Sequence, residues 1–200
     1  MKRKQYTRGL RVGVPISLGY LAVAFTMGIT ARNAGLSAVQ ATLTSFLVNA
    51  SAGQYAAFTL MAAQGGYLEM AILELVTNAR YLLMSCSLSQ KLSPKTKLWQ
   101  RLTVGFAVTD EMFGMAIAEP EEVSPWYYFG MMSIAIPGWS LGTFLGTTVG
   151  NILLANVVSL PVFAGIASGT KLILLTVVLS AGAALLFPVK DEEPGEEETP

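Results

Sequence analysis

Long uncharged stretches dominate the pattern of polar and apolar positions along the chain. Residues 12–31, 33–68 and 123–170 contain no charged side chain, and apolar residues fill most of each stretch. A helix needs about 20 apolar residues to cross the hydrocarbon core of a bilayer. The pattern therefore predicts an all-α, polytopic helical membrane protein.

The polar residues between these stretches place the expected helices. Spans are expected over residues 12–30, 67–88, 98–118 and 126–149, with a last helix over residues 170–187. They would form one transmembrane domain over residues 12–189. It would lie between a basic arm at residues 1–11 and an acidic, disordered tail at residues 190–200.

Composition narrows the possible classes of function. Charged residues make up 13% of the chain, whereas a soluble domain carries about 25%. The chain has one cysteine, Cys86, and no histidine. These counts exclude a disulfide framework and leave no Cys/His metal cluster, so we expect no metal and no cofactor. Basic residues form no continuous face beyond the N-terminal arm, which argues against binding to nucleic acid.

The basic residues set the expected topology. They gather in the N-terminal arm and in the loop at residues 91–101, and cytoplasmic segments of membrane proteins carry an excess of Lys and Arg. Both segments, including the N-terminus, should then be cytoplasmic, which requires an even number of crossings between them. Residues 36–65 meet this requirement as a broken, re-entrant pair of half-helices that enters and leaves on one side. Two complete crossings within residues 36–65 would need helices that are too short to span the bilayer.

A polar run at residues 49–54 marks the expected break. Ser51 and Gln54 fit a capping box, which would start a half-helix near Ala52. The N-terminus of such a half-helix offers free N–H groups and the positive end of its dipole, which suit an anionic group. From the local sequence alone, a kinked continuous helix with Gly53 as its weak point is the alternative.

Ionisable residues also lie inside the expected spans. Glu74 and Asn78 are four positions apart and share one helix face. Arg80 points elsewhere and needs a partner, for which Asp110 and Glu111 are the candidates. A charge at mid-bilayer is costly unless it is paired or hydrated. If the carboxyl groups of Glu74, Asp110 and Glu111 are all ionised, their charges and that of Arg80 sum to −2. At least one carboxyl group should therefore hold a proton for part of a transport cycle. A static Arg80–Asp110 pair that locks two helices is the alternative.

Glycine recurs at every fourth position along the expected span at residues 126–149 and at the residue that follows it. The residues are Gly138, Gly142, Gly146 and Gly150. A stripe of small residues lets another helix approach closely within a membrane. We expect a helix-packing face, either within this chain or toward a partner.

In their order along the chain, these motifs resemble the AzlC family. The matching segments are Gly13-Val14-Pro15-Ile16, Ala52-Gly53-Gln54, Asn78-Ala79-Arg80-Tyr81-Leu82-Leu83, Thr109-Asp110-Glu111 and Trp139-Ser140-Leu141-Gly142-Thr143. The resemblance covers about residues 10–150. Beyond it, residues 151–169 look abbreviated relative to the family.

The resemblance implies the large subunit of a branched-chain amino acid exporter of the azaleucine-resistance type. Such a protein would lie in a prokaryotic cytoplasmic membrane, use the proton-motive force and work with a small AzlD-type membrane subunit. The family pattern points to Gln54, Asn78, Arg80, Asp110 and Glu111. We interpret Ser51, Gly53, Gln54 and Asn78 as substrate-binding residues, with the half-helix start and Gln54 on the substrate carboxylate. We assign Glu74, Arg80, Asp110 and Glu111 to proton coupling or ion pairing, with Asp110 or Glu111 on the substrate ammonium group.

The sequence also bears on two other classes of function. An intramembrane enzyme would need a nucleophile with a base or a pair of aspartates. The chain has no histidine, and Asp110 is the single aspartate within the expected spans, so no enzymatic activity is expected. A non-transporting membrane scaffold or channel subunit would suit the glycine stripe and the ion pair equally well.

Overall fold

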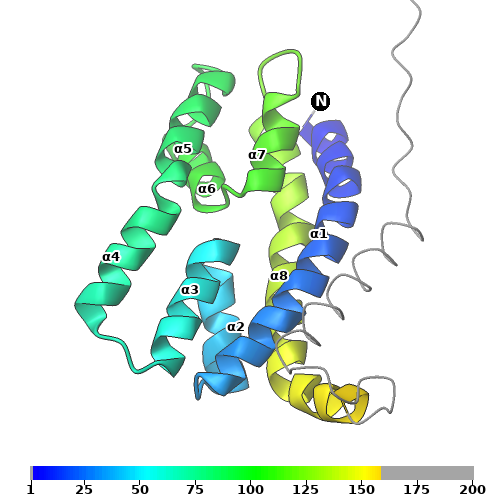
Figure 1. Cartoon of the computed structure of the whole chain (residues 1–200). Helices are drawn as coiled ribbons and strands as arrows, with labels where there is room; N and C mark the ends of the chain where they lie inside the picture. Colours follow the sequence, from blue (N-terminus) through cyan, green and yellow to red (C-terminus); the bar gives the residue numbers. More distant parts are fainter. Residues whose placement is uncertain (1, 159–200) are drawn as a thin grey trace, which may run out of the picture.

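A computed structural model describes residues 2–158 (Figure 1). This part of the chain contains eight α-helices: α1 (Lys2–Asn33), α2 (Ala38–Leu47), α3 (Ser51–Ala62), α4 (Tyr67–Asn78), α5 (Arg80–Lys91), α6 (Leu98–Phe106), α7 (Asp110–Ile117) and α8 (Pro125–Val158). The predicted helix over 170–187, the tail at 190–200 and residues 159–169 of the abbreviated segment lie outside the described residues.

Helices α1 and α8 run side by side and parallel, and they form the scaffold of the molecule (Figure 1). The glycine stripe of α8 faces α1: Gly138 lies against Ser17, Gly142 against Leu21, Gly146 against Phe25 and Gly150 against Ile29. A methyl group at Gly146 would overlap the backbone oxygen of Phe25. The stripe therefore packs within the chain. Among the described helices, α1 meets the length and composition expected of a membrane-spanning helix.

The predicted re-entrant pair at residues 36–65 is confirmed. Helix α2 enters from the end of the molecule opposite the N-terminus, and α3 returns to that same end (Figure 1). Between them the backbone is extended at Val48 and Ala50. The side chain of Gln54 donates to the hydroxyl of Ser45, nine positions earlier. A continuous helix would separate these residues by about 13 Å, so the hydrogen bond requires a reversal of the chain.

Helices α4 and α5 together carry the chain back to the N-terminal end (Figure 1). They are separated by a single residue, Ala79, where the regular hydrogen bonding is interrupted. This pair corresponds to the span predicted over residues 67–88.

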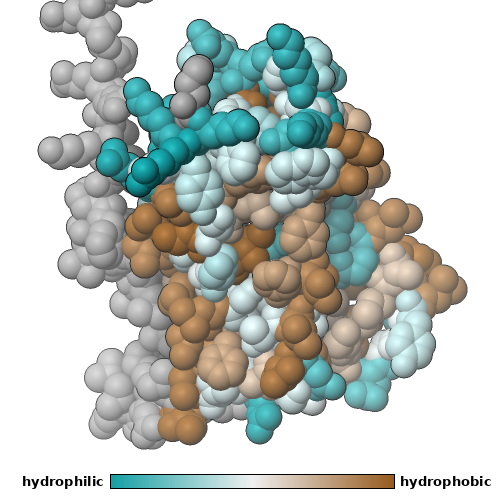
Figure 2. Space-filling model, turned by 180° about the vertical axis from the view of Figure 1, so that it is seen from behind, coloured by the Kyte–Doolittle hydropathy of each residue, from teal (hydrophilic) through white to brown (hydrophobic). Residues whose placement is uncertain are grey.

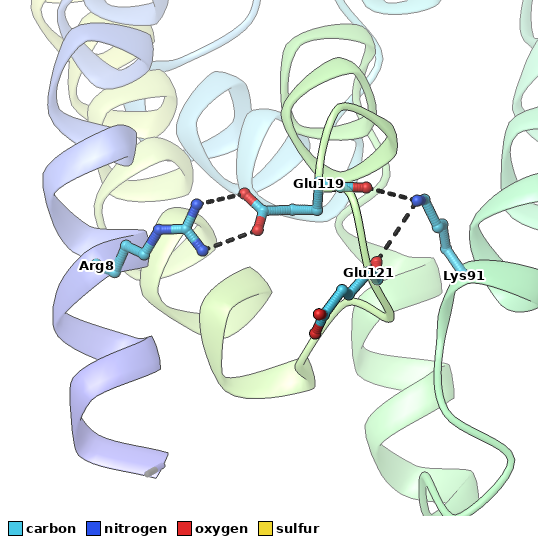
Figure 3. A network of polar contacts seen from close by, with 4 residues as sticks. All are labelled: Arg8, Lys91, Glu119 and Glu121. Carbon is cyan, nitrogen blue, oxygen red and sulfur yellow. Dashed lines mark hydrogen bonds and ion pairs between the residues drawn. The ribbon is translucent and has the colours of Figure 1, made fainter. Parts of the chain in front are cut away.

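The span predicted over residues 98–118 is wrong, because this segment is a second re-entrant pair. Helices α6 and α7 have nine and eight residues, so each is only about 12–14 Å long. The loops on either side of the pair lie together: the backbone N–H of Val123 donates to Lys91, and the Lys91 ammonium donates to the backbone oxygen of Glu119 (Figure 3). The acidic loop at residues 119–122 is therefore at the same end as the basic loop.

The described chain thus repeats one unit in opposite orientations. Helix α1 crosses the molecule and is followed by the α2–α3 hairpin; α4 and α5 cross back and are followed by the α6–α7 hairpin (Figure 1). Inverted repeats with broken helices are frequent in secondary transporters. The breaks at residues 48–50 and 107–109 are brought together at mid-depth, where both contribute to one cavity.

The surface matches this arrangement. On the face seen in Figure 2, hydrophilic residues gather at the N-terminal end, and hydrophobic residues cover most of the surface below. On α4 to α6, apolar side chains such as Leu68, Val76, Leu83 and Leu102 are strongly exposed. In water such a surface would be unfavourable, whereas it suits contact with hydrocarbon.

Candidate functional site

A cavity of about 130 Å³ lies where the two hairpin breaks meet. It is lined by Tyr20, Val23, Asn49, Ser51, Tyr81, Thr109, Asp110, Glu111 and Trp139. Pockets for drug-sized ligands have volumes of about 300–1,000 Å³. This cavity therefore has the scale of a small metabolite, and its lining comes from α1, α5, α8 and both hairpins.

The first pole of the cavity is the N-terminus of α3. The helix begins at Ser51, and its N-cap residue, Ala50, supplies no side-chain hydrogen bond. At the same break, the side-chain nitrogen of Asn49 is buried and has no partner. Free backbone N–H groups and an unpaired amide donor together favour an anion, such as a carboxylate.

The capping box predicted at Ser51 is wrong. Ser51 is the first residue of α3 rather than its cap, and Gln54 bonds to other side chains. A capping box does form one helix earlier, between Ser37 and Gln40 at the start of α2. The predicted start of α3, near Ala52, is one residue later than the observed start at Ser51.

The second pole is the N-terminus of α7, and it is acidic. Thr109 caps the helix by accepting from the backbone N–H of Met112, and Asp110 and Glu111 form the start of the first turn. The hydroxyl oxygen of Tyr20 lies 2.5 Å from Glu111 Oε2 and 2.6 Å from Thr109 Oγ1. A phenol has one proton, so with an ionised Glu111 it donates to that carboxylate and accepts from Thr109.

Arg80 pairs with Asp110, the partner foreseen from the sequence, with 2.9 Å between Nη2 and Oδ2. The guanidinium also lies over the ring of Tyr81, 5.2 Å from its centroid. The two charged side chains keep exposed fractions of 45% and 44%. The pair is therefore an accessible contact between α5 and α7, rather than an ion pair sealed inside the protein.

Glu74, Asn78 and Gly53 form a separate cluster that does not line the cavity. The amide of Asn78 donates to Glu74 Oε2 at 2.6 Å. A Cβ at Gly53 would fall within 2.8 Å of both side chains, so α3 approaches α4 closely there. Glu74 Oε1 and Asn78 Oδ1 are buried without a hydrogen-bond partner.

Gln54 also lies outside the cavity lining. Its side chain is 1% exposed, donates to Ser45 and accepts from the indole of Trp139 at 3.1 Å. Of the residues predicted to bind substrate, Ser51 alone lines the cavity. From the predicted ion-pair set, Asp110 and Glu111 do so.

Six of the nine residues that line the cavity were not among the predicted site residues: Tyr20, Val23, Asn49, Tyr81, Thr109 and Trp139. Tyr20, Val23 and Trp139 lie on α1 and α8, within uncharged stretches. A buried tyrosine or tryptophan normally finds a hydrogen-bond partner for its polar atom. That rule could have marked Tyr20 and Trp139, but it does not say which distant residue is the partner.

Comparison with known proteins relates the chain to a family of membrane proteins. A family model described as "AzlC protein" matches residues 15–153. An "Uncharacterized membrane protein" of Archaeoglobus fulgidus is 34% identical over 155 residues, which are 78% of this chain and 67% of the relative. "Inner membrane protein YgaZ" of Escherichia coli is 28% identical over 151 residues, 72% and 59% of the two chains. No solved structure matches the chain.

Proposed function

The chain belongs to the AzlC family of membrane proteins, and from this premise we propose that it is a secondary transporter subunit that exports branched-chain and other hydrophobic amino acids. The relative named as an inner membrane protein supports a location in a prokaryotic cytoplasmic membrane. The match spans 59–67% of the two relatives' lengths, so the activity of the whole protein is part of the proposal.

One observation carries the proposal: the cavity has two chemically different poles. The N-terminus of α3 and the free amide of Asn49 favour a carboxylate. Asp110 and Glu111, at the opposite hairpin, favour an ammonium group. An amino acid carries both groups on one carbon atom, so it can bridge the two hairpins.

The remaining wall suits an apolar side chain. Val23, Tyr20 and Trp139 supply aliphatic and aromatic surface between the poles. Burial of that surface favours a hydrophobic amino acid over a polar one, because the cavity offers few further hydrogen-bond partners. This preference supports branched-chain substrates without ranking them.

Arg80 suggests how binding is linked to movement. In the absence of substrate it neutralises Asp110. A substrate ammonium group competes with the guanidinium for the same carboxylate, so binding weakens the contact between α5 and α7. A proton on Asp110 or Glu111 would compete with the ammonium group in turn, which favours exchange of substrate for protons. With the N-terminus cytoplasmic, the two hairpins would open the cavity alternately to the two sides.

A small AzlD-type membrane subunit is the proposed partner, and this element rests on the family. The strongly exposed apolar residues of α4 to α6 leave surface for such a protein or for lipid. No enzymatic step is part of the proposal.

Counterflow of labelled leucine tests the proposal. Vesicles that contain the chain, with and without a co-expressed AzlD-type subunit, are preloaded with unlabelled leucine and placed in labelled leucine. We expect labelled leucine to accumulate transiently, and export to accelerate with an inward proton gradient. Asp110→Asn should reduce both the accumulation of labelled leucine and its export. Glu122→Gln, in the exposed acidic loop, should reduce neither.

Two results would contradict the proposal. Asp110→Asn and Arg80→Gln variants that fold and still export normally would remove the mechanism. A complete absence of counterflow with the partner present would favour a non-transporting scaffold or channel subunit.

A further inference from the structure

We propose that Trp139 limits the size of the amino-acid side chain that the cavity accepts, and that Gln54 is the positioning residue that holds its indole ring. The inference rests on the proposed transport function and assigns selectivity within the same cavity. It also gives Gln54 a role different from the carboxylate contact expected from the sequence.

The geometry is a closed ring of hydrogen bonds between α2, α3 and α8. The indole N–H of Trp139 donates to Gln54 Oε1 at 3.1 Å, and Gln54 Nε2 donates to the hydroxyl of Ser45. Ser45 and Thr143 share a hydrogen bond of 2.7 Å. The hydroxyl of Thr143 lies 3.3 Å from the backbone oxygen of Trp139, which closes the ring.

Every member of this ring is buried. The exposed fractions are 0% for Ser45 and Thr143, 1% for Gln54 and 4% for Trp139. A buried polar network in which each member has its partner is rigid, because any rotation leaves a donor or an acceptor unpaired. Both ends of the Gln54 amide are engaged, so the side chain is committed to protein contacts.

Trp139 is the member of the ring that lines the cavity. The ring of Tyr20 also contacts the indole edge to face, with 5.5 Å between the centroids. The indole is therefore fixed by α8, by Gln54 and by Tyr20, and it cannot swing away to enlarge the space. A rigid aromatic wall in a cavity of about 130 Å³ accepts a branched aliphatic side chain and excludes an aromatic one.

Selectivity between leucine and phenylalanine tests the inference. Trp139→Phe shortens the wall, and we expect the ratio of phenylalanine to leucine counterflow to rise by about 10-fold or more, since a single methylene in an apolar pocket is worth about 10- to 200-fold. Gln54→Met keeps the approximate shape but removes both hydrogen bonds, and it should shift the ratio in the same direction by a smaller factor.

The double variant shows whether Gln54 acts through Trp139. If it does, Gln54→Met adds little to the ratio once Trp139→Phe is present. Trp99→Phe is the matched control, because Trp99 stacks on Phe129 and does not line the cavity. Equal losses for both substrates in Gln54→Met, with an unchanged ratio, would assign Gln54 a structural role only and overturn the inference.

Fluorescence gives a readout that does not depend on transport. The chain has three tryptophans, so Trp99→Phe with Trp126→Phe leaves Trp139 as the sole emitter. Leucine should change its emission at lower concentration than phenylalanine does, and Gln54→Met should reduce that difference. If fluorescence distinguishes leucine from phenylalanine but no counterflow occurs, the transport function is contradicted and the size limit set by Trp139 is supported. If counterflow occurs but fluorescence does not distinguish the two amino acids, the transport function is supported and the size limit is contradicted.

Discussion

Arg8 and Glu119 lie 111 positions apart in the chain and form a two-point ion pair, with Nη1 2.8 Å from Oε2 and Nη2 2.7 Å from Oε1 (Figure 3). Lys91 of α5 donates to the backbone oxygen of the same glutamate. The loop after α7 is therefore tied to α1 on one side and to α5 on the other. These contacts hold the N-terminal end of the molecule together.

Glu119→Gln should lower the free energy of unfolding only slightly, although it breaks the ion pair with Arg8. The side chains of Arg8 and Glu119 are 52% and 18% exposed, so solvent screening limits the loss of stability to at most about 1 kcal/mol. Thermal unfolding in detergent should show the difference at low salt and lose it near 1 M salt, where the Debye length is about 3 Å. A large, salt-independent loss would contradict a screened surface pair.

The pH dependence of this pair follows from Arg8. Its hydrogen bond to Glu119 raises the pKa of Arg8 above the ordinary value. A raised pKa in the folded state gives stability that is present at lower pH and lost as pH rises through that pKa. The contribution of the Arg8 cation should therefore stay constant across neutral pH and disappear only in strongly alkaline solution.

Accessibility of introduced cysteines tests the second hairpin. In a Cys86→Ser background, Lys95→Cys and Glu121→Cys should react with an impermeant reagent from the same side of the membrane, because the loops that hold them are in contact. Gln64→Cys should react from the other side. Reaction of positions 95 and 121 from opposite sides would mean that residues 98–118 cross the membrane.

Gly146→Ala and Gly19→Ala should differ in their effect on stability. Gly146→Ala places a methyl group against the backbone of Phe25 and should destabilise the α1–α8 pair by about 1–3 kcal/mol. A Cβ at Gly19 meets nothing within 4 Å, so Gly19→Ala should be neutral or stabilising by up to about 1 kcal/mol. Thermal unfolding measures both, and equal effects would argue against a tight helix contact.

Tyr20→Phe should impair transport without unfolding the protein. The substitution removes the hydroxyl that contacts Glu111 and Thr109 and keeps the ring against Trp139. A hydrogen bond to a charged group is worth about 1.5–3 kcal/mol, so we expect about a 10- to 100-fold fall in leucine counterflow. Tyr55→Phe is the control, since Tyr55 is exposed on α3. Equal activity of the two variants would show that the phenol is dispensable.

Glu74→Gln should raise stability rather than lower it. Glu74 Oε1 and Asn78 Oδ1 are both buried acceptors without a donor, and an amide supplies the missing donor. A gain of about 1 kcal/mol is expected in thermal unfolding. Glu69→Gln, five positions earlier on α4, should change stability little. Destabilisation by Glu74→Gln would mean that the carboxylate makes a favourable contact absent from this arrangement.

The first hairpin could be predicted from the sequence and the second could not, for identifiable reasons. Charge bias at the two basic segments required an even number of crossings, and residues 36–65 were the one uncharged stretch that could fold back. Residues 98–118 have the length of a single span. Thr109 with two acidic residues after it is a typical helix start, but the same residues also resemble charges buried within a span.

The candidate site was predicted in part. Arg80, Asp110 and Glu111 could be found because a charge within a hydrophobic segment needs a partner. The hydrogen-bond partners of Gln54 could not be predicted, because Ser45 and Trp139 come from two other helices. No local pattern shows which distant helix will meet a given amide.

Opposed hairpins that are each about half as long as the bilayer is thick also have an electrical consequence. Where water fills the space between a hairpin and its face of the membrane, the membrane potential falls across the short region around the two helix breaks. It then does not fall across the whole hydrocarbon core, which is about 30 Å thick. Moving one elementary charge past Asp110 then changes the energy by up to about 2.3 kcal/mol per 100 mV. A membrane potential would act most strongly where the two chain breaks meet.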